Sequence, residues 1–152
     1  MKKDILDEID KGIIRILQED ARKSYREIQN ELGISIGTIH NRIDKLKKKG
    51  IIQGYTLKLD NSKLGYNLTF LIRIQIDGKY TSEILEEISK KPEVCSVFHT
   101  TGEQSAALIC RFVESEDVHK FIRELNERKY ITRTNSNMVL KEYKNSSYVE
   151  IT

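Results

Sequence analysis

Residues 35–50, SIGTIHNRIDKLKKKG, carry the side chains whose types and spacing indicate a chemistry most clearly. Ile39, Ile43 and Leu46 fall at i, i+4 and i+7, which predicts an apolar stripe along one side of a helix. Hydroxyl, imidazole, amide and cationic groups occupy the other sides. Such groups can hydrogen-bond to the edges of bases and neutralise phosphates. We therefore expect one side of this helix to pack and the other to bind a ligand.

The ends of this helix and the segment before it indicate a helix-turn-helix. Ser35 is a suitable N-cap, and Gly50 stands where a left-handed residue is favoured after a helix. Upstream, residues 24–27, SYRE, have the form of a capping box, which predicts a short helix that ends at Gly33. Residues 7–17 predict a third helix, with Asp7 as its cap. A unit of this kind presents its last helix to the major groove of DNA.

The excess positive charge of the chain lies in its first third. Residues 1–50 hold 12 Lys and Arg against 9 Asp and Glu, whereas residues 51–152 hold 14 of each. This distribution is expected where phosphates must be neutralised. The alternatives are a three-helix core without DNA binding and a lysine run that merely solvates a helix end. A membrane surface is disfavoured, because the helix lacks the Trp, Phe or Leu face that would enter the headgroup region.

We therefore predict that the helix at residues 35–50 binds double-stranded DNA. Phosphate contacts are expected from Arg42, Lys45 and residues 47–49, and base contacts from Thr38, His40 and Asn41. The amide of Asn41 is suited to adenine, with which it can form paired hydrogen bonds. The full predicted contact set is Ser35, Gly37, Thr38, His40, Asn41, Arg42, Lys45, Lys47, Lys48 and Lys49.

The remainder of the chain predicts a second domain. Tyr55, Leu57 and Leu59 alternate with polar residues, which predicts a strand that connects the two domains. After a turn-rich break, the periodicities follow the order β-α-β-β-α-β of the ferredoxin-like fold. Leu71 and Val97 are expected on the sheet face away from the helices, which favours a partner subunit there.

The predicted fold class is therefore α+β. An N-terminal winged or helix-turn-helix three-helix domain occupies residues 1–50, a strand linker 51–64, and a C-terminal ferredoxin-like domain 65–152.

Composition and the absence of known motifs argue against several other classes of function. No run of roughly 18 apolar residues and no signal-like start occurs, so we expect a cytoplasmic protein without membrane partners. Cys95 and Cys110 lie in apolar, strand-like runs and are expected to be core thiols, with no histidine at metal-ligand spacing. No P-loop, dinucleotide-binding fingerprint or nucleophile elbow is present, so no cofactor is predicted.

These motifs resemble the Lrp/AsnC family, the leucine-responsive and asparagine-responsive transcription regulators. Residues 6–10, LDEID, are similar to the family's L-D-x-x-D opening, and residues 14–22 to its I-L-x-x-L-x-x-(D/N)-(A/G)-R stretch. Residues 39–46 resemble its V-x-x-R-I-x-x-L recognition helix, and residues 50–52 its G-(V/I)-I exit. Residues 100–102, TTG, resemble the T-G loop of its effector-binding module.

The resemblance implies a homodimer formed through the C-terminal sheets, often assembled into tetramers or octamers, that binds pseudo-palindromic DNA. It also implies that an amino acid or related small molecule binds between subunits. The corresponding residues are Thr101, Gly102, Glu103, Gln104, Ser105, Tyr130, Ile131, Thr132 and Thr134. Ser105 departs from the family's T-G-x-x-D pattern. Either Glu103 replaces the aspartate in holding the ammonium group of the effector, or the specificity differs.

An enzyme on the same scaffold is the alternative, since sirohaem decarboxylases resemble this family in both domains. Such an enzyme needs His or Arg near the carboxylates of its substrate. His99 and Arg111 are the candidates in the predicted sheet. A basic recognition helix has no use in that reaction, so the sequence favours a regulator without enzymatic activity.

Overall fold

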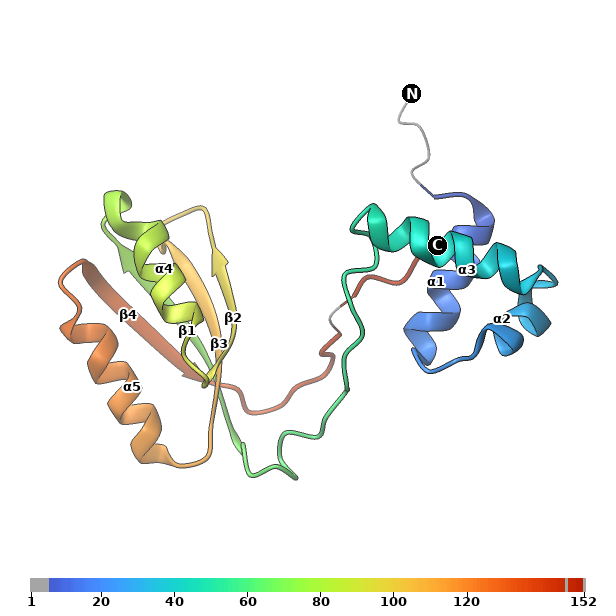
Figure 1. Cartoon of the computed structure of the whole chain (residues 1–152). Coiled ribbons are helices and arrows are strands. Elements are labelled where there is room, and N and C mark those ends of the chain that lie inside the picture. The colour runs from blue at the N-terminus through green and yellow to red at the C-terminus, as the bar shows by residue number, and fades with distance from the viewer. Residues whose placement is uncertain (1–5, 147, 152) are drawn as a thin grey trace. The chain divides into compact units, whose positions relative to one another are not determined.

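The computed structural model describes residues 6–146 and 148–151 and confirms an α+β chain (Figure 1). The described residues form two compact units. The first, here called the helical unit, comprises residues 6–58, 145–146 and 148–151; the second, the sheet unit, comprises residues 59–144. Each unit has its own hydrophobic core.

Three helices build the helical unit: α1 (Glu8–Glu19), α2 (Tyr25–Leu32) and α3 (Ile36–Lys48). Each begins at the predicted cap, because the side chains of Asp7, Ser24 and Ser35 accept hydrogen bonds from backbone N–H groups of the first turn. Gly33 ends α2 with a φ of 68°, a left-handed conformation that favours glycine. The predicted helix-turn-helix is therefore confirmed.

One side of α3 is buried against α1 and α2. Ile39, Ile43 and Leu46 are at most 1% exposed, and the first two join Ile13 and Ile28 in the core of the unit. The predicted apolar stripe of α3 is thus the side that packs, and the opposite side of this helix remains on the surface.

Arg42 links the start of α1 to the middle of α3. Asp7 and Asp10 form a reciprocal capping box, in which the Asp10 N–H donates to Asp7 Oδ1 over 2.9 Å. Arg42 Nη1 donates to Asp7 Oδ2 and, over 3.2 Å, to Oδ1 of the buried Asp10. The Asp10 N–H bond and then Arg42 lower the pKa of Asp7 below its usual 3.8, because both favour its charged form. Two carboxylates thus hold the guanidinium of Arg42, whose side chain stays partly exposed, and its contact with phosphate stays a prediction.

The predicted connecting strand is also absent. Residues 51–67 form neither helix nor strand, and the Leu57 side chain is 78% exposed. A strand needs a neighbour for its backbone hydrogen bonds, and the described chain places none beside this segment. The last residues also differ from the predicted domain limits, since residues 145–151 belong to the helical unit. There Arg15 Nε donates to the Ile151 carbonyl over 3.1 Å, and Gln18 Nε2 to the Val149 carbonyl over 3.2 Å.

The sheet unit has the predicted ferredoxin-like order. Its elements are β1 (Leu68–Ile76), the short 3-10 helix η1 (Gly78–Tyr80), α4 (Thr81–Ser89), β2 (Val94–His99), β3 (Ala106–Phe112), α5 (Ser115–Glu127) and β4 (Ile131–Met138). The antiparallel sheet has the order β2-β3-β1-β4. Both α4 and α5 cover the same face of it (Figure 1). Ile72, Ile74 and Leu108 point into that layer and are fully buried.

The other face of the sheet, here called the open face, carries apolar side chains without helices over them. Leu71 pairs with Ile109 across β1 and β3. A bulge between Val94 and Ser96 shifts the alternation of β2, so Val97 packs on the core and Phe98, 53% exposed, takes the outward position. The prediction that Val97 lies on the open face is therefore wrong.

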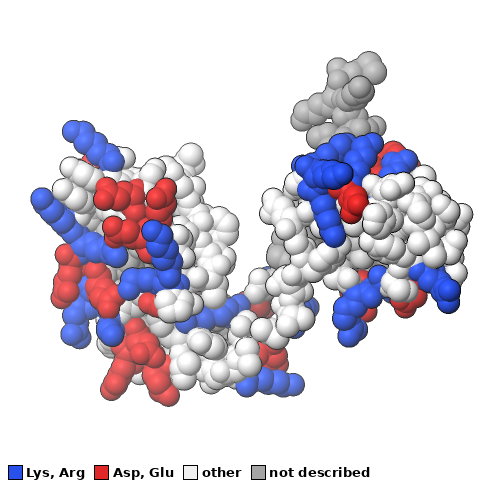
Figure 2. Space-filling model, in the orientation of Figure 1, with Lys and Arg blue, Asp and Glu red and all other residues white. Residues whose placement is uncertain are grey.

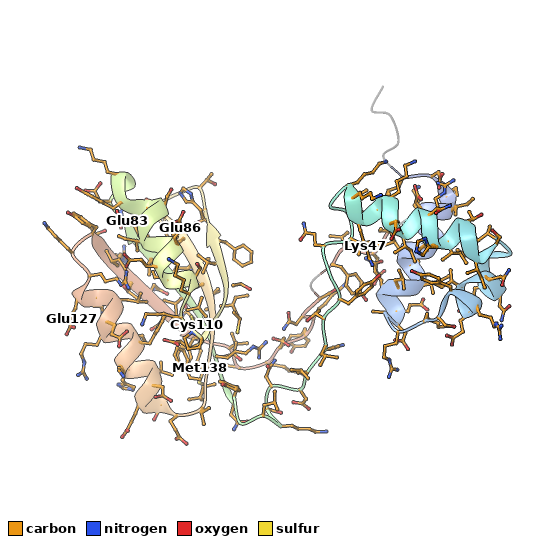
Figure 3. The ribbon with its side chains drawn as sticks, in the orientation of Figure 1. Lys47, Glu83, Glu86, Cys110, Glu127 and Met138 are labelled. Atoms are coloured by element: carbon orange, nitrogen blue, oxygen red, sulfur yellow. The ribbon has the colours of Figure 1, made fainter. Side chains whose placement is uncertain are left out.

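The two thiols lie in different environments. Cys110 is buried under the helices (Figure 3), and burial raises the pKa of its thiol to about 12. Cys95, at the bulge of β2, is exposed, so the expectation of two core thiols holds only for Cys110. Among the described residues, no cluster of side chains could hold a metal ion, and no helix is long and apolar enough to cross a membrane.

We predict that Arg42→Ala destabilises the helical unit, because the buried Asp10 carboxylate loses its cationic partner. Lys45→Ala is the matched control. It removes an exposed cation of the same helix that forms no ion pair with a described residue, so its free energy of unfolding should stay within about 0.5 kcal/mol of wild type. Urea unfolding followed by circular dichroism measures both. Equal midpoints for the two variants would contradict the role assigned to Arg42.

Candidate nucleic-acid interface and effector site

The exposed side of α3 is the candidate nucleic-acid interface. His40, Asn41 and Lys45 lie on it, followed by three further exposed lysines at residues 47–49. Lys and Arg side chains gather over the C-terminal end of α3, whereas basic and acidic side chains are mixed over the sheet unit (Figure 2). The surface of α3 thus runs from side chains that can hydrogen-bond to bases to side chains that neutralise phosphates.

The first turn of α3 uses its hydroxyl groups internally. Ser35 Oγ accepts from the Thr38 N–H over 3.1 Å and lies 2.9 Å from Thr38 Oγ1. The Ser35 hydroxyl therefore caps the helix and also forms a hydrogen bond with the Thr38 hydroxyl. Thr38 is also half-buried, which leaves less of its side chain for a base than the sequence suggested.

His40 and Asn41 present polar atoms to solvent. His40 Nδ1 lies 3.7 Å from Asp44 Oδ2, and its ring stands edge-on to Tyr25 with a centroid distance of 6.0 Å. These contacts orient the imidazole. The amide of Asn41 forms no side-chain hydrogen bond with any described residue. Asn41 can therefore offer both its donor and its acceptor to a ligand.

The lysines near the end of α3 are available to phosphates. Lys45, Lys48 and Lys49 form no ion pair within the described chain. The ammonium of Lys47, labelled in Figure 3, lies 5.4 Å from the ring centre of Tyr55, a cation–π contact with the segment after the helix.

Sequence reasoning missed Ile36, the first residue of α3. Its side chain is 41% exposed, and no other large hydrophobic side chain of α1, α2 or α3 reaches that exposure. Ile36 precedes Ile39 by three residues and Ile43 by seven, so helical spacing places it beside the apolar stripe, and no signal in the sequence indicated its exposure.

The candidate effector site lies at the end of the sheet where β2 joins β3. Gly102 has a φ of 105°, a conformation that favours glycine in this loop. Thr100 closes the loop, since its Oγ1 donates to the Gln104 carbonyl over 2.7 Å. Ser105 Oγ accepts from the Ile76 N–H over 3.0 Å and donates to the Ile76 carbonyl over 3.2 Å. The Ser105 hydroxyl thus fastens the loop to β1.

The second predicted segment, residues 130–134, reaches the same place. Arg133 Nη1 donates to Glu103 Oε1 over 3.1 Å, which joins β4 to the loop at residues 101–105. Thr132 Oγ1 donates to the Gln75 carbonyl over 3.3 Å. Tyr130 stacks on Tyr80 at a centroid distance of 3.5 Å, and Ile131 is buried in the core. The structure brings the two predicted segments together, although several of their side chains form hydrogen bonds or packing contacts within the sheet unit.

Two oxygens of this set lack partners. Gln104 Oε1 and Thr134 Oγ1 are buried and form no hydrogen bond with a described residue. A buried polar atom without a partner costs free energy. Gln104 belongs to the loop and is suited to accept a hydrogen bond from a ligand, whereas Thr134 pairs with Ile74 and lies on the helix side of the sheet.

The candidates for an enzymatic site do not converge. His99 pairs with Ala106 at one end of β3, and Arg111 lies five residues further along that strand, roughly 17 Å away. Arg111 donates to Thr69 Oγ1 over 3.2 Å and to Glu142 Oε2 over 3.1 Å, so its guanidinium is already engaged. One subunit therefore does not place both side chains around one substrate.

Two family models match the chain in the order of its two units. Residues 6–53 match a winged helix-turn-helix DNA-binding domain, and residues 69–149 match the Lrp/AsnC ligand-binding domain. The first match contains α1, α2 and α3, and the second contains nearly all of β1 and the rest of the sheet.

Relatives match over almost the whole length. An uncharacterised helix-turn-helix type transcriptional regulator of Pyrococcus abyssi is 42% identical over 96% of this chain and 99% of its own. The structure of Escherichia coli AsnC, 27% identical, covers 95% of this chain and 98% of its own with a TM-score of 0.87. A Neisseria meningitidis transcriptional regulator, solved as a complex with L-methionine, is 26% identical, covers 95% and 96%, and has a TM-score of 0.88. The chain belongs to the Lrp/AsnC family of DNA-binding transcriptional regulators.

Proposed function

We propose that the protein binds a two-fold symmetric operator as a homodimer and responds to a small amino-acid-like effector held between subunits. The exposed side of α3 is the observation that carries the DNA-binding part. It joins exposed hydrogen-bonding groups to exposed lysines on a helix whose opposite side is fully packed. Two such helices related by a dimer axis would enter successive major grooves, about 34 to 36 Å apart.

The lysines set the affinity in this proposal, and His40 and Asn41 set the sequence preference. Each phosphate neutralised by a lysine releases condensed counterions, so binding weakens as the salt concentration rises. Asn41 is suited to adenine through paired hydrogen bonds in the major groove. Arg42 holds α3 on α1, and its partly exposed guanidinium is a further candidate for a phosphate contact.

Replacing Lys45 and Lys48 by Ala should weaken binding to all duplexes by a similar factor. The slope of log affinity against log salt should become shallower by about 0.9 for each phosphate that is no longer neutralised. Fluorescence anisotropy with a duplex selected from random sequence measures both effects. The control removes two exposed lysines of the sheet unit, Lys90 and Lys120, and should change neither. An unchanged slope in the first variant would place the DNA elsewhere.

The open face of the sheet is the proposed dimer interface. Leu71, Ile109 and Phe98 give it an apolar centre, and arginine and asparagine side chains of β1 and β4 surround them. A protein–protein interface commonly has such an apolar centre and polar rim. Isologous packing of two open faces would bury these side chains in both subunits at once.

Leu71→Asp should convert the dimer into a monomer, because the new carboxylate would lose its hydration at the apolar centre of the interface. Size-exclusion chromatography with light scattering measures the mass. Met138→Asp is the control, because Met138 is also accessible but pairs with Phe70 on the helix side of the sheet. A wild-type protein that is already monomeric, or a Leu71→Asp variant that keeps its mass, would refute this interface.

The effector is proposed to bind at the loop of residues 101–105 and at residues 130–134. The Glu103 carboxylate and the Arg133 guanidinium lie side by side there, one suited to an ammonium group and the other to a carboxylate. The unpaired oxygen of Gln104 favours a ligand with further hydrogen-bond donors, such as a small polar amino acid. The related regulator crystallised with L-methionine supports an amino acid as the class of ligand.

A thermal-shift screen of the twenty amino acids should identify at least one that raises the melting temperature. A ligand present at 100 times its Kd stabilises the folded state by about 2.7 kcal/mol. Glu103→Gln should reduce this shift, since the variant loses the negative charge opposite the ammonium group. Glu114→Gln, an exposed glutamate at the start of α5, should leave it unchanged. Equal shifts for the two variants would exclude Glu103 from the effector site.

A further inference from the structure

Ile36 places a partly exposed apolar side chain at the start of α3, where the packed side of the helix borders its polar outer side. It is a branched aliphatic residue, 41% exposed, beside the cap residue Ser35. The aliphatic residues that build the helical core are at most 8% exposed. A substantial part of the Ile36 side chain therefore lies outside the core, and exposing this part to water is unfavourable.

Gly37, the next residue, has no structural reason to be glycine. Its φ is not in the left-handed region, and a Cβ built there would have Ser35 Oγ at 4.0 Å as its nearest neighbour. Gly12 of α1 is different, because a Cβ there would lie 2.9 Å from Leu32 Cδ2. Glycine is less favourable than alanine in a helix, so at Gly37 it serves something other than the helix. Its missing side chain opens space on the outside of α3.

These two residues continue the face that carries the base-reading candidates. Ile36 precedes His40 by four residues, and Gly37 precedes Asn41 by four, so the four residues form two adjacent rows on α3. The N-terminal part of a recognition helix is the part that contacts base edges in the major groove.

We propose that Ile36 recognises thymine through its C5-methyl group and that Gly37 allows α3 to approach that base closely. The inference rests on the proposed DNA-binding function. The thymine methyl is the apolar group that bases display in the major groove, and it is the natural partner for an aliphatic side chain. Polar groups on His40 and Asn41 beside it and the lysines at the helix end fit a duplex rather than a protein partner.

The test replaces single thymines by deoxyuridine, which removes the methyl group and leaves base pairing intact. A duplex is first selected from random sequence with the wild-type protein, and each thymine in it is then exchanged in turn. We expect one position in each half-site at which the exchange weakens wild-type binding about fourfold, the value of one buried methyl group. At that position, the Ile36→Ala variant should bind the thymine and deoxyuridine duplexes equally well, because it lacks the aliphatic groups that contact the thymine methyl.

Two further variants separate recognition from stability. Gly37→Ala should keep or raise the melting temperature and still weaken binding, because its new methyl group occupies the space left for the base edge. Val113→Ala, which trims an exposed aliphatic residue of the sheet unit, should keep the full thymine preference. Equal wild-type affinity for every thymine and deoxyuridine duplex would overturn the inference and leave DNA binding in place. Failure to enrich any duplex would overturn the proposed function itself.

Discussion

The packing of α3 against α1 and α2 is the constraint on which the candidate interface depends. Burial of Ile39, Ile43 and Leu46 fixes the rotation of the helix about its axis, and this rotation decides which residues reach a ligand. Arg42 adds a second restraint, because it holds the carboxylates of the α1 cap. Sequence-specific recognition requires such a rigid arrangement, since base contacts depend on accurate placement of a few side chains.

In the sheet unit, as in α3, one side is packed into the core and the opposite side is left at the surface. Two helices bury one face of the sheet, and the open face keeps Leu71, Ile109 and Phe98 at the surface. At one end of this sheet, the Glu103–Arg133 ion pair joins the loop after β2 to β4. A dimer through the open face and a ligand at that end would therefore be adjacent, and a ligand that prefers one dimer geometry could shift the population toward it.

The sequence predicted the features that depend on neighbouring residues, such as helix caps and turns. It did not predict features that depend on contacts between residues far apart in the chain. Asp7, Ser24, Ser35 and Gly33 were identified because caps and left-handed turns act within one helical turn. The two carboxylates that bind Arg42 lie more than thirty residues away from it, so no local pattern could reveal these ion pairs. The bulge in β2 turns the Val97 side chain to the core and the Phe98 side chain to the open face, and the alternation of apolar residues gives no sign of this bulge. The strand expected at residues 55–59 lacked a pairing neighbour, which no pattern within the segment could reveal.

In the proposed complex, two copies of α3 occupy the major groove on one face of the duplex. Dimethyl sulfate footprinting tests this placement directly, because the reagent modifies guanine N7, an atom of the major groove. We expect two clusters of protected guanines, with centres about 10 base pairs apart, on a selected operator. Tight binding that leaves every guanine N7 reactive, or that protects a single cluster, would contradict the placement of two α3 helices in the major groove.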